Sequence, residues 1–130
     1  MLTITKDLET GVAKVDEQHR ELVNQLNSMM TSQGSTRDEN EKTLQFLTEY
    51  ALMHFKTEED LMEECKYPAL LIHQGQHRLF VEKYLVFKEN FEKDPDANSV
   101  SVDMLDFLKS WLLNHIKVSD VAFGKFYAEQ

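Results

Sequence analysis

Two pairs of potential ligand side chains, one on each side of a helix break, constrain the fold most strongly. His54 and Glu58 stand four residues apart, and His73 and His77 have the same spacing further along the chain. This spacing places both members of a pair on one face of a helix. Pro68 stands between the pairs and disfavours helical geometry in the residue before it, so two helices are expected. Helices joined by a short turn pack side by side, which would let the two pairs converge.

Apolar side chains recur at alternating steps of three and four residues along four segments, which is the period of an amphipathic helix. The predicted helices cover approximately residues 16–31, 36–64, 68–91 and, starting at Ser99 or Ser101, up to Gly124. The second begins with a capping box of Thr36 and Glu39. Residues 1–15 are expected to form an extended arm ending near Gly11, and turns are expected at 32–35 and 93–98.

These elements predict an all-α protein, an up-down-up-down four-helix bundle with an N-terminal extended arm, as a single domain over residues 1–130. The apolar stripe of the second helix is expected to end with Leu61 and Cys65, and that of the fourth with Val118 and Ala122. Cys65 is predicted to be a buried, inert thiol. The methionines are expected to fill the core rather than bind metal, namely Met29, Met30, Met53 and Met62.

The net charge of −9 argues against nucleic acid or an anionic membrane surface as a partner, because both reward basic side chains. No run of about 18 apolar residues is present, so no membrane span is expected. Cys65 is the only cysteine, which fits a reducing compartment. The first residues lack the basic and apolar pattern of a signal peptide, and a cytoplasmic location is therefore expected.

All five histidines lie on the predicted core-facing stripes of the four helices, at positions 19, 54, 73, 77 and 115. One buried histidine is most often a core residue with a hydrogen-bond partner, but five of them, joined by Glu58, would need many partners at once. A metal satisfies these groups together. Imidazole suits Fe, Zn, Cu and Ni, and a carboxylate can bridge two ions. The set exceeds what one tetrahedral zinc uses, so a dinuclear site is predicted.

At this point the chain resembles the bacterial hemerythrins, a family of non-haem di-iron oxygen-binding bundles. The resemblance covers the chain from about Gly11 to Tyr127. Its matching motifs are GVAKVDEQH ending at His19, His54-FKT-Glu58, Tyr67-Pro68, His73-QGQ-His77 and Trp111-LLN-His115-IKVS-Asp120. The resemblance implies reversible binding of O2, for carriage or storage, and no enzymatic activity.

The resemblance also implies a cofactor of two Fe ions joined by an oxo or hydroxo bridge. One iron would be bound by His73, His77 and His115. The other would be bound by His19 and His54 and keep an open position, and Glu58 and Asp120 would bridge the two. Asp120 rests on the resemblance alone. It follows the last histidine by five residues, about 140° around an ideal helix, so periodicity predicts that it is exposed.

A dry pocket for O2 is expected beside the open position, and its candidate lining residues are Phe55, Trp111, Leu112 and Leu113. Plain core packing would account for the same side chains. Two other functions remain open. One is an oxygen or redox sensor that acts through a soluble protein partner, and the other is a di-iron enzyme that consumes peroxide or nitric oxide. Many family members carry a tryptophan in the arm, but the only one here is Trp111, so the arm is expected to pack differently.

Overall fold

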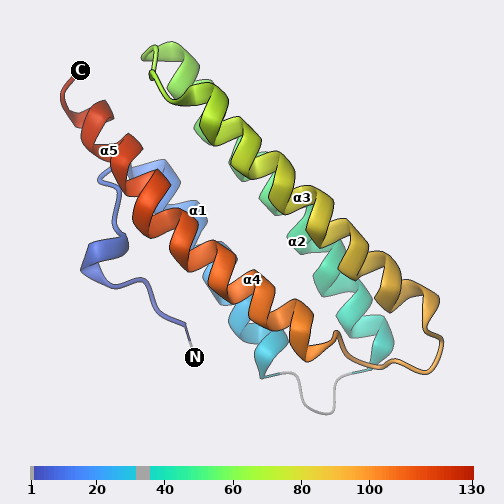
Figure 1. Ribbon diagram of the computed structural model, residues 1–130. Helices are drawn as coiled ribbons and strands as arrows, with labels where there is room; N and C mark the ends of the chain where they lie inside the picture. Colours follow the sequence, from blue (N-terminus) through green and yellow to red (C-terminus); the bar gives the residue numbers. More distant parts are fainter. Residues whose placement is uncertain (1, 32–35) are drawn as a thin grey trace.

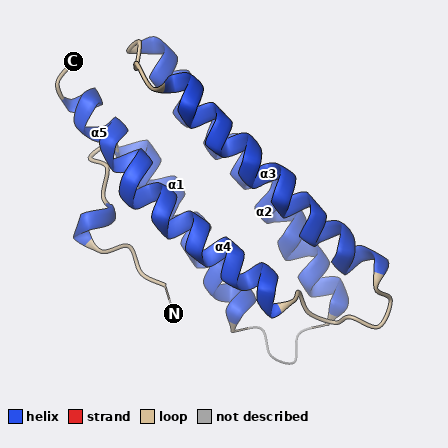
Figure 2. Ribbon diagram, viewed as in Figure 1, coloured by secondary structure: helices blue, strands red, loops and turns tan. Residues whose placement is uncertain are grey.

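Long helices lie side by side and form the bundle that the sequence predicts (Figures 1 and 2). The structure, a computed structural model, describes residues 2–31 and 36–130. The bundle helices are α1 (Ala13–Met30), α2 (Arg37–Glu64), α3 (Leu70–Lys93) and α4 (Val102–His115). A five-residue π-helix, η2 (Ile116–Asp120), joins α4 to α5 (Val121–Ala128), which continues along the line of α4 (Figure 1). The described residues contain no strand, and the all-α class is confirmed. Among these helices, none has the length and apolar character that crossing a membrane requires.

The helix starts follow from local side-chain chemistry. Thr36 Oγ1 accepts the backbone N–H of Glu39 at 3.1 Å, as the capping box predicts. Ser101 caps α4 in the same way, and its Oγ accepts the N–H of Met104 at 3.1 Å. Helix α3 begins at Leu70 and not at Pro68, because residues 67–69 are still part of the turn. The turn predicted at 32–35 lies outside the described residues.

The N-terminal arm is less extended than predicted. It contains a 3-10 turn, η1 (Lys6–Leu8), and α1 begins three residues before Asp16, at Ala13. The Asp16 carboxylate accepts the backbone N–H and the hydroxyl of Thr10 at 2.8 Å each, and the N–H of Gly11 at 3.1 Å. Gly11 has a φ of 84°, which favours glycine. Asp16 thus sits inside the first turn of α1 and holds the arm against it.

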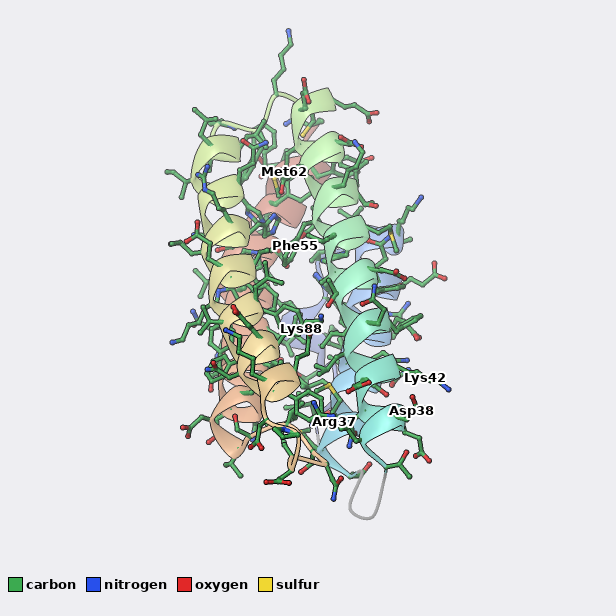
Figure 3. The ribbon with its side chains drawn as sticks, turned by 90° about the vertical axis from the view of Figure 1, so that its right-hand side faces the viewer. Arg37, Asp38, Lys42, Phe55, Met62 and Lys88 are labelled. Carbon is green, nitrogen blue, oxygen red and sulfur yellow. The ribbon has the colours of Figure 1, made fainter. Side chains whose placement is uncertain are left out.

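A layer of polar side chains separates two apolar clusters inside the bundle. On α2, Phe55 belongs to the larger cluster and Met62 to the smaller one, and Glu58 lies between them. Helix α1 repeats the arrangement, with Leu22 in the larger cluster, Val15 in the smaller one and a histidine between. Figure 3 shows Phe55 and Met62 at two levels of the same helix, both beside α3. The apolar layers therefore enclose the polar one from both ends.

The end of the α2 stripe differs from the prediction. Met62 is fully buried, whereas Leu61 and Cys65 are only half-buried. Met62 packs in the smaller apolar cluster, so the last turn of α2 points that side chain inward. Of the other methionines, Met29 fills the core as predicted, Met30 is partly buried, and Met53 is 42% exposed. The prediction that Met53 fills the core was therefore wrong, and Cys65 is half-buried against the smaller apolar cluster rather than fully buried.

The fourth helix is not the single α-helix that was predicted. Val118 is 60% exposed and Ala122 is exposed, whereas Asp120 and Phe123 are fully buried. The cause is η2, because a π turn closes over five residues and thereby adds one residue to the helical count. Every side chain after it is displaced by one position. The helix also continues past Gly124, to Ala128.

Candidate metal centre

The polar layer brings together the seven residues that were predicted as ligands, and all of them are at most 5% exposed. They come from all four helices of the bundle, counting η2 as the continuation of α4. The set comprises His19 on α1, His54 and Glu58 on α2, His73 and His77 on α3, His115 at the end of α4 and Asp120 at the end of η2. They form two overlapping groups in which one ligand atom of each residue lies within 4.8 Å of all the others.

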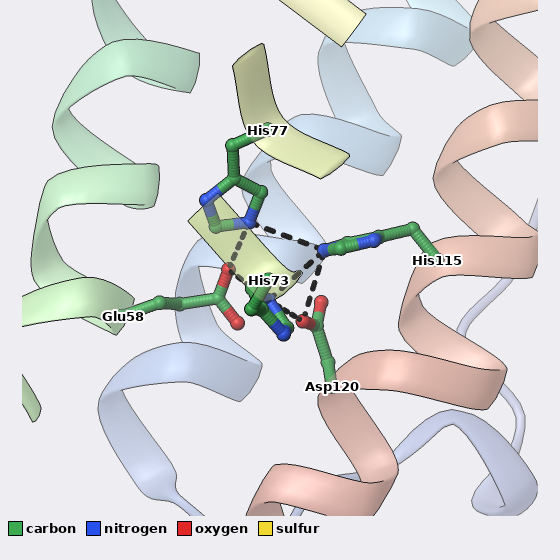
Figure 4. Close-up of side chains that lie close together, drawn as sticks. All are labelled: Glu58, His73, His77, His115 and Asp120. Atoms are coloured by element: carbon green, nitrogen blue, oxygen red, sulfur yellow. Dashed lines mark hydrogen bonds and ion pairs between the residues drawn. The ribbon is translucent and has the colours of Figure 1, made fainter. Parts of the chain in front are cut away.

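The first group holds three imidazoles and two carboxylates (Figure 4). The Nε2 atoms of His77 and His73 each lie 3.1 Å from Nε2 of His115. Glu58 Oε1 lies 3.4 Å from His77 Nε2, and Asp120 Oδ1 lies 3.0 Å from His73 Nε2. Each of the three imidazole rings thus points one nitrogen at a common point. A bound metal ion requires this arrangement, whereas imidazoles that bind no metal do not require it.

The second group holds two imidazoles and the same two carboxylates. His54 Nε2 lies 3.2 Å from Glu58 Oε1, and His19 Nε2 lies 3.0 Å from Asp120 Oδ2. Glu58 and Asp120 belong to both groups, so each carboxylate lies between two potential metal positions. The two positions are unequal, because one is surrounded by three histidines and the other by two.

Several buried polar atoms of the centre lack hydrogen bonds. Both oxygens of Glu58, both oxygens of Asp120 and both ring nitrogens of His19 are buried, and none has a hydrogen bond of normal geometry. An unpaired buried carboxylate is costly, and it persists only if a cation or donor compensates it. The close contacts between these atoms and their neighbours are ion-pair distances around a shared centre. The donor set therefore fits metal ions.

The electrostatics of the layer keep the imidazoles in the form that binds metal. Burial lowers the pKa of His54 to about 3 and that of His77 to about 2, so both rings are neutral at neutral pH. Burial, followed by the charge of Asp120, raises the pKa of Glu58 well above its usual range. For Asp120 burial acts in the same direction, but close contacts with the imidazoles, that of His115 first, hold its pKa well below the usual range.

Helix η2 explains how Asp120 reaches the centre. In an α-helix a residue five positions after His115 would point about 140° away from it. The π turn brings residues five apart onto one face, and Asp120 Oδ1 lies 3.2 Å from His115 Nε2. The exposure that periodicity predicts for Asp120 was therefore wrong, and π-bulges of this kind often occur at functional sites.

Two polar residues that hold the ligands were not identified from the sequence. Gln18 Oε1 lies 2.7 Å from His54 Nδ1, and Glu59 Oε2 lies 2.7 Å from His77 Nδ1. With Nδ1–H as the donor, Nε2 of each ring keeps its lone pair for the centre. Each residue is the sequence neighbour of a ligand, about 100° around the helix from it, and so reaches a ligand on the adjacent helix. That adjacency is the only signal the sequence offers.

An apolar cavity of about 30 Å³ adjoins the polar layer. Three of the four predicted pocket residues, Phe55, Trp111 and Leu112, line it. Leu113 is half-buried and packs against the larger apolar cluster, but it is not among the described residues that line the cavity. The Phe55 ring stacks on His77 with centroids 3.9 Å apart, and the indole of Trp111 stacks on His115 at 4.4 Å.

A four-helix bundle whose core carries a histidine-rich, carboxylate-linked site defines a class of metal-binding bundle proteins. Residues 10–125 match the Hemerythrin HHE cation binding domain, and the chain belongs to the hemerythrin family. It is 31% identical to the bacteriohemerythrin of Stenotrophomonas maltophilia over 125 residues, which are 95% of this chain and 80% of that protein. Identity to the bacteriohemerythrin of Methylococcus capsulatus is 30%, over 88% of this chain and 87% of that protein. A crystal structure of wild-type hemerythrin superimposes with a TM-score of 0.84 at 29% identity, and covers 96% of this chain and 95% of that one.

Proposed function

We propose that this protein binds O2 reversibly at a non-haem di-iron centre. The observation that carries the proposal is the inequality of the two ligand groups, which share both carboxylates but hold three and two histidines. The position with two histidines has fewer protein ligands and can accept an exogenous one. Two ferrous ions held in this way would supply the electrons that bind O2 and take them back on release.

Iron is supported by the chemistry of the donors. Neutral imidazole and carboxylate together suit iron, whereas a structural zinc site uses four ligands in total. Seven converging residues are more than one zinc ion can use. Their histidine-rich composition also differs from that of the carboxylate-rich di-iron bundles, in which Glu-x-x-His pairs predominate.

The cavity supports binding without turnover. Leu22 lies one helical turn from His19, and Ala51 lies one turn from His54. Phe55 and Trp111 stack on His77 and His115, so the cavity adjoins both ligand groups. Its lining among the described residues is apolar throughout, which suits a small apolar molecule and excludes water. No acid or base faces the cavity from that lining to transfer protons to a bound substrate. We therefore propose a carrier or store and not an enzyme. The unpaired thiol of Cys65 fits a reducing, cytoplasmic setting.

The test is one anaerobic titration of iron-loaded protein. The protein is first analysed for two irons per chain and reduced, and its visible spectrum is recorded before O2 is admitted and after O2 is purged. A band that appears with O2 and disappears on purging is the expected result. Protein loaded with redox-inactive zinc is the matched control and should show no such band. Irreversible oxidation of the ferrous protein within the mixing time would refute the proposal, and a catalysed loss of added peroxide or nitric oxide would then favour the enzyme.

A further inference from the structure

The two hydrogen bonds that hold ligand imidazoles from behind have equal lengths but unequal charges. His77 in the three-histidine group faces the carboxylate of Glu59, and His54 in the two-histidine group faces the neutral amide of Gln18, each at 2.7 Å. A hydrogen bond to a carboxylate is roughly twice as strong as one between neutral groups. Glu59 and Gln18 therefore add to the difference between the two metal positions that the ligands themselves establish.

Glu59 is placed to act on His77 and on little else. Among the described residues its only hydrogen bond or ion pair is the one to His77 Nδ1. The nearby Lys56 is paired with Asp60 at 3.1 Å, so it does not neutralise Glu59. The Glu59 side chain is 26% exposed and lines a groove of about 720 Å³ between α2 and α3, whereas His77 is only 3% exposed. The negative charge of Glu59 thus acts on the buried centre through the imidazole of His77.

A carboxylate behind a ligating imidazole makes the ring a stronger electron donor, and this favours the more highly charged state of a bound metal. A neutral amide orients the ring in the same way but supplies no charge. We propose that Glu59 is a positioning residue that acts through His77 and lowers the reduction potential of the metal at the three-histidine position. This inference rests on the proposed redox-active centre. It predicts that, when the reduced centre loses one electron, the metal at the three-histidine position is oxidised first.

The decisive variant is Glu59→Gln, which keeps an oxygen acceptor for His77 and removes only the charge. Its matched control is Glu63→Gln, because Glu63 lines the same groove one turn further along α2 and is exposed. Both variants change the net charge equally. The potentials of the iron-loaded proteins are measured by spectroelectrochemistry, and the oxidised site is assigned by Mössbauer spectroscopy. We expect Glu59→Gln to raise the first potential by about 59 mV, a tenfold change in the ferric preference, and Glu63→Gln to leave it unchanged.

A second variant and a metal-free measurement make the test independent of O2 binding. Gln18→Glu places a carboxylate behind His54 and should lower the potential of the two-histidine metal. In metal-free protein, 15N NMR of the imidazoles should show the Nδ1–H tautomer of His77 in wild type and in Glu59→Gln, and a mixture of tautomers in Glu59→Ala. Glu59→Ala should also weaken the binding of one metal equivalent by about 10- to 100-fold.

Equal first potentials in wild type, Glu59→Gln and Glu63→Gln would overturn the inference, and so would a His77 tautomer that does not change in Glu59→Ala. A protein that shows these shifts but binds O2 irreversibly would disprove the proposed carrier function and leave the role of Glu59 intact. The two proposals therefore fail by different measurements.

Discussion

Among the glycines that the structure describes, Gly124 is the one at which an added methyl group would meet the closest contacts. A Cβ built on this α5 residue would lie 2.1 Å from the carbonyl oxygen of Thr10 and 2.8 Å from its carbonyl carbon. Ordinary contacts between such atoms lie at about 3.5 Å or more, so the arm or α5 must retreat by roughly 1.5 Å. Both obstructing atoms belong to backbone, which cannot rotate away as a flexible side chain can.

The arm cannot retreat freely, because the Asp16 carboxylate holds it. Thr10 donates two hydrogen bonds to Asp16 and Gly11 donates a third. Each is worth about 1 kcal/mol net, and overpacking of a tight site costs about 1–3 kcal/mol by itself. Detaching the arm would cost about 3 kcal/mol and displacing the end of the bundle about 1–3 kcal/mol, while alanine in place of glycine in α5 returns about 0.5–1 kcal/mol. Gly124→Ala should therefore lower the free energy of unfolding by about 1–2 kcal/mol.

Urea denaturation of the metal-free protein, followed by circular dichroism, measures this loss, and Gly75→Ala is the matched control. Gly75 also lies inside a helix, α3, but its Cβ would meet only the end of the Arg78 side chain at 3.8 Å. Alanine there should stabilise by about 0.5–1 kcal/mol, since glycine is a poor helix former. If Gly124→Ala proved as stable as Gly75→Ala, the close docking of the arm on α5 would be wrong.

Three further predictions concern the π segment, the buried histidines and a helix terminus. Deletion of the exposed Val118 should let η2 close as an ordinary α turn and leave Asp120 on the ligand face, so metal analysis should still find two metals per chain. An alanine inserted at the same place should turn Asp120 away from that face and reduce the number of metals. Burial lowers the pKa of His54 to about 3 and of His77 to about 2. Below pH 6.5 these two histidines therefore bind protons in the unfolded chain and stay neutral in the folded chain. The raised pKa of Glu58 acts in the opposite direction and offsets about one of these two protons. Metal-free protein should then lose up to about 1.4 kcal/mol net for each pH unit below 6.5, and a urea midpoint that stays constant from pH 7 to 5 would contradict this. Arg37→Ala should cost about 1–3 kcal/mol in urea denaturation, since the guanidinium donates to the carbonyls of residues 91, 92, 94 and 97, and an unchanged midpoint would show that these bonds contribute nothing.

The fold was predictable because its signals are local and repeated. Three- and four-residue steps recur in each long helix, and two of the helix starts carry hydroxyl caps, at Thr36 and Ser101. Boundaries were less predictable where a distant contact sets them. The arm folds onto α1 because a carboxylate inside the helix, that of Asp16, accepts bonds from Thr10, and no periodicity reports such a contact.

The candidate site was predictable to the extent that its residues keep the helical phase. The five histidines and Glu58 are in phase with apolar stripes, so burial of the stripes buries them as well. Gln18 and Glu59 are out of phase with those stripes, and each lies beside a ligand rather than on its face. Their roles depend on how far one helix is rotated against the next, which the pattern of a single helix does not determine.

At Asp120, the one residue that the π turn adds to the helix decides which side chains are buried. Regular periodicity would bury Val118 and Ala122 and expose the aspartate, yet the π turn of η2 reverses all three outcomes at once. The same displacement buries Phe123, which closes the apolar cluster beside the centre. The π turn is less favourable than a continuous α turn, and the chain retains it where it carries the second shared carboxylate. At a spacing of five residues from His115, Asp120 thus reaches the centre only through this local break in helical geometry.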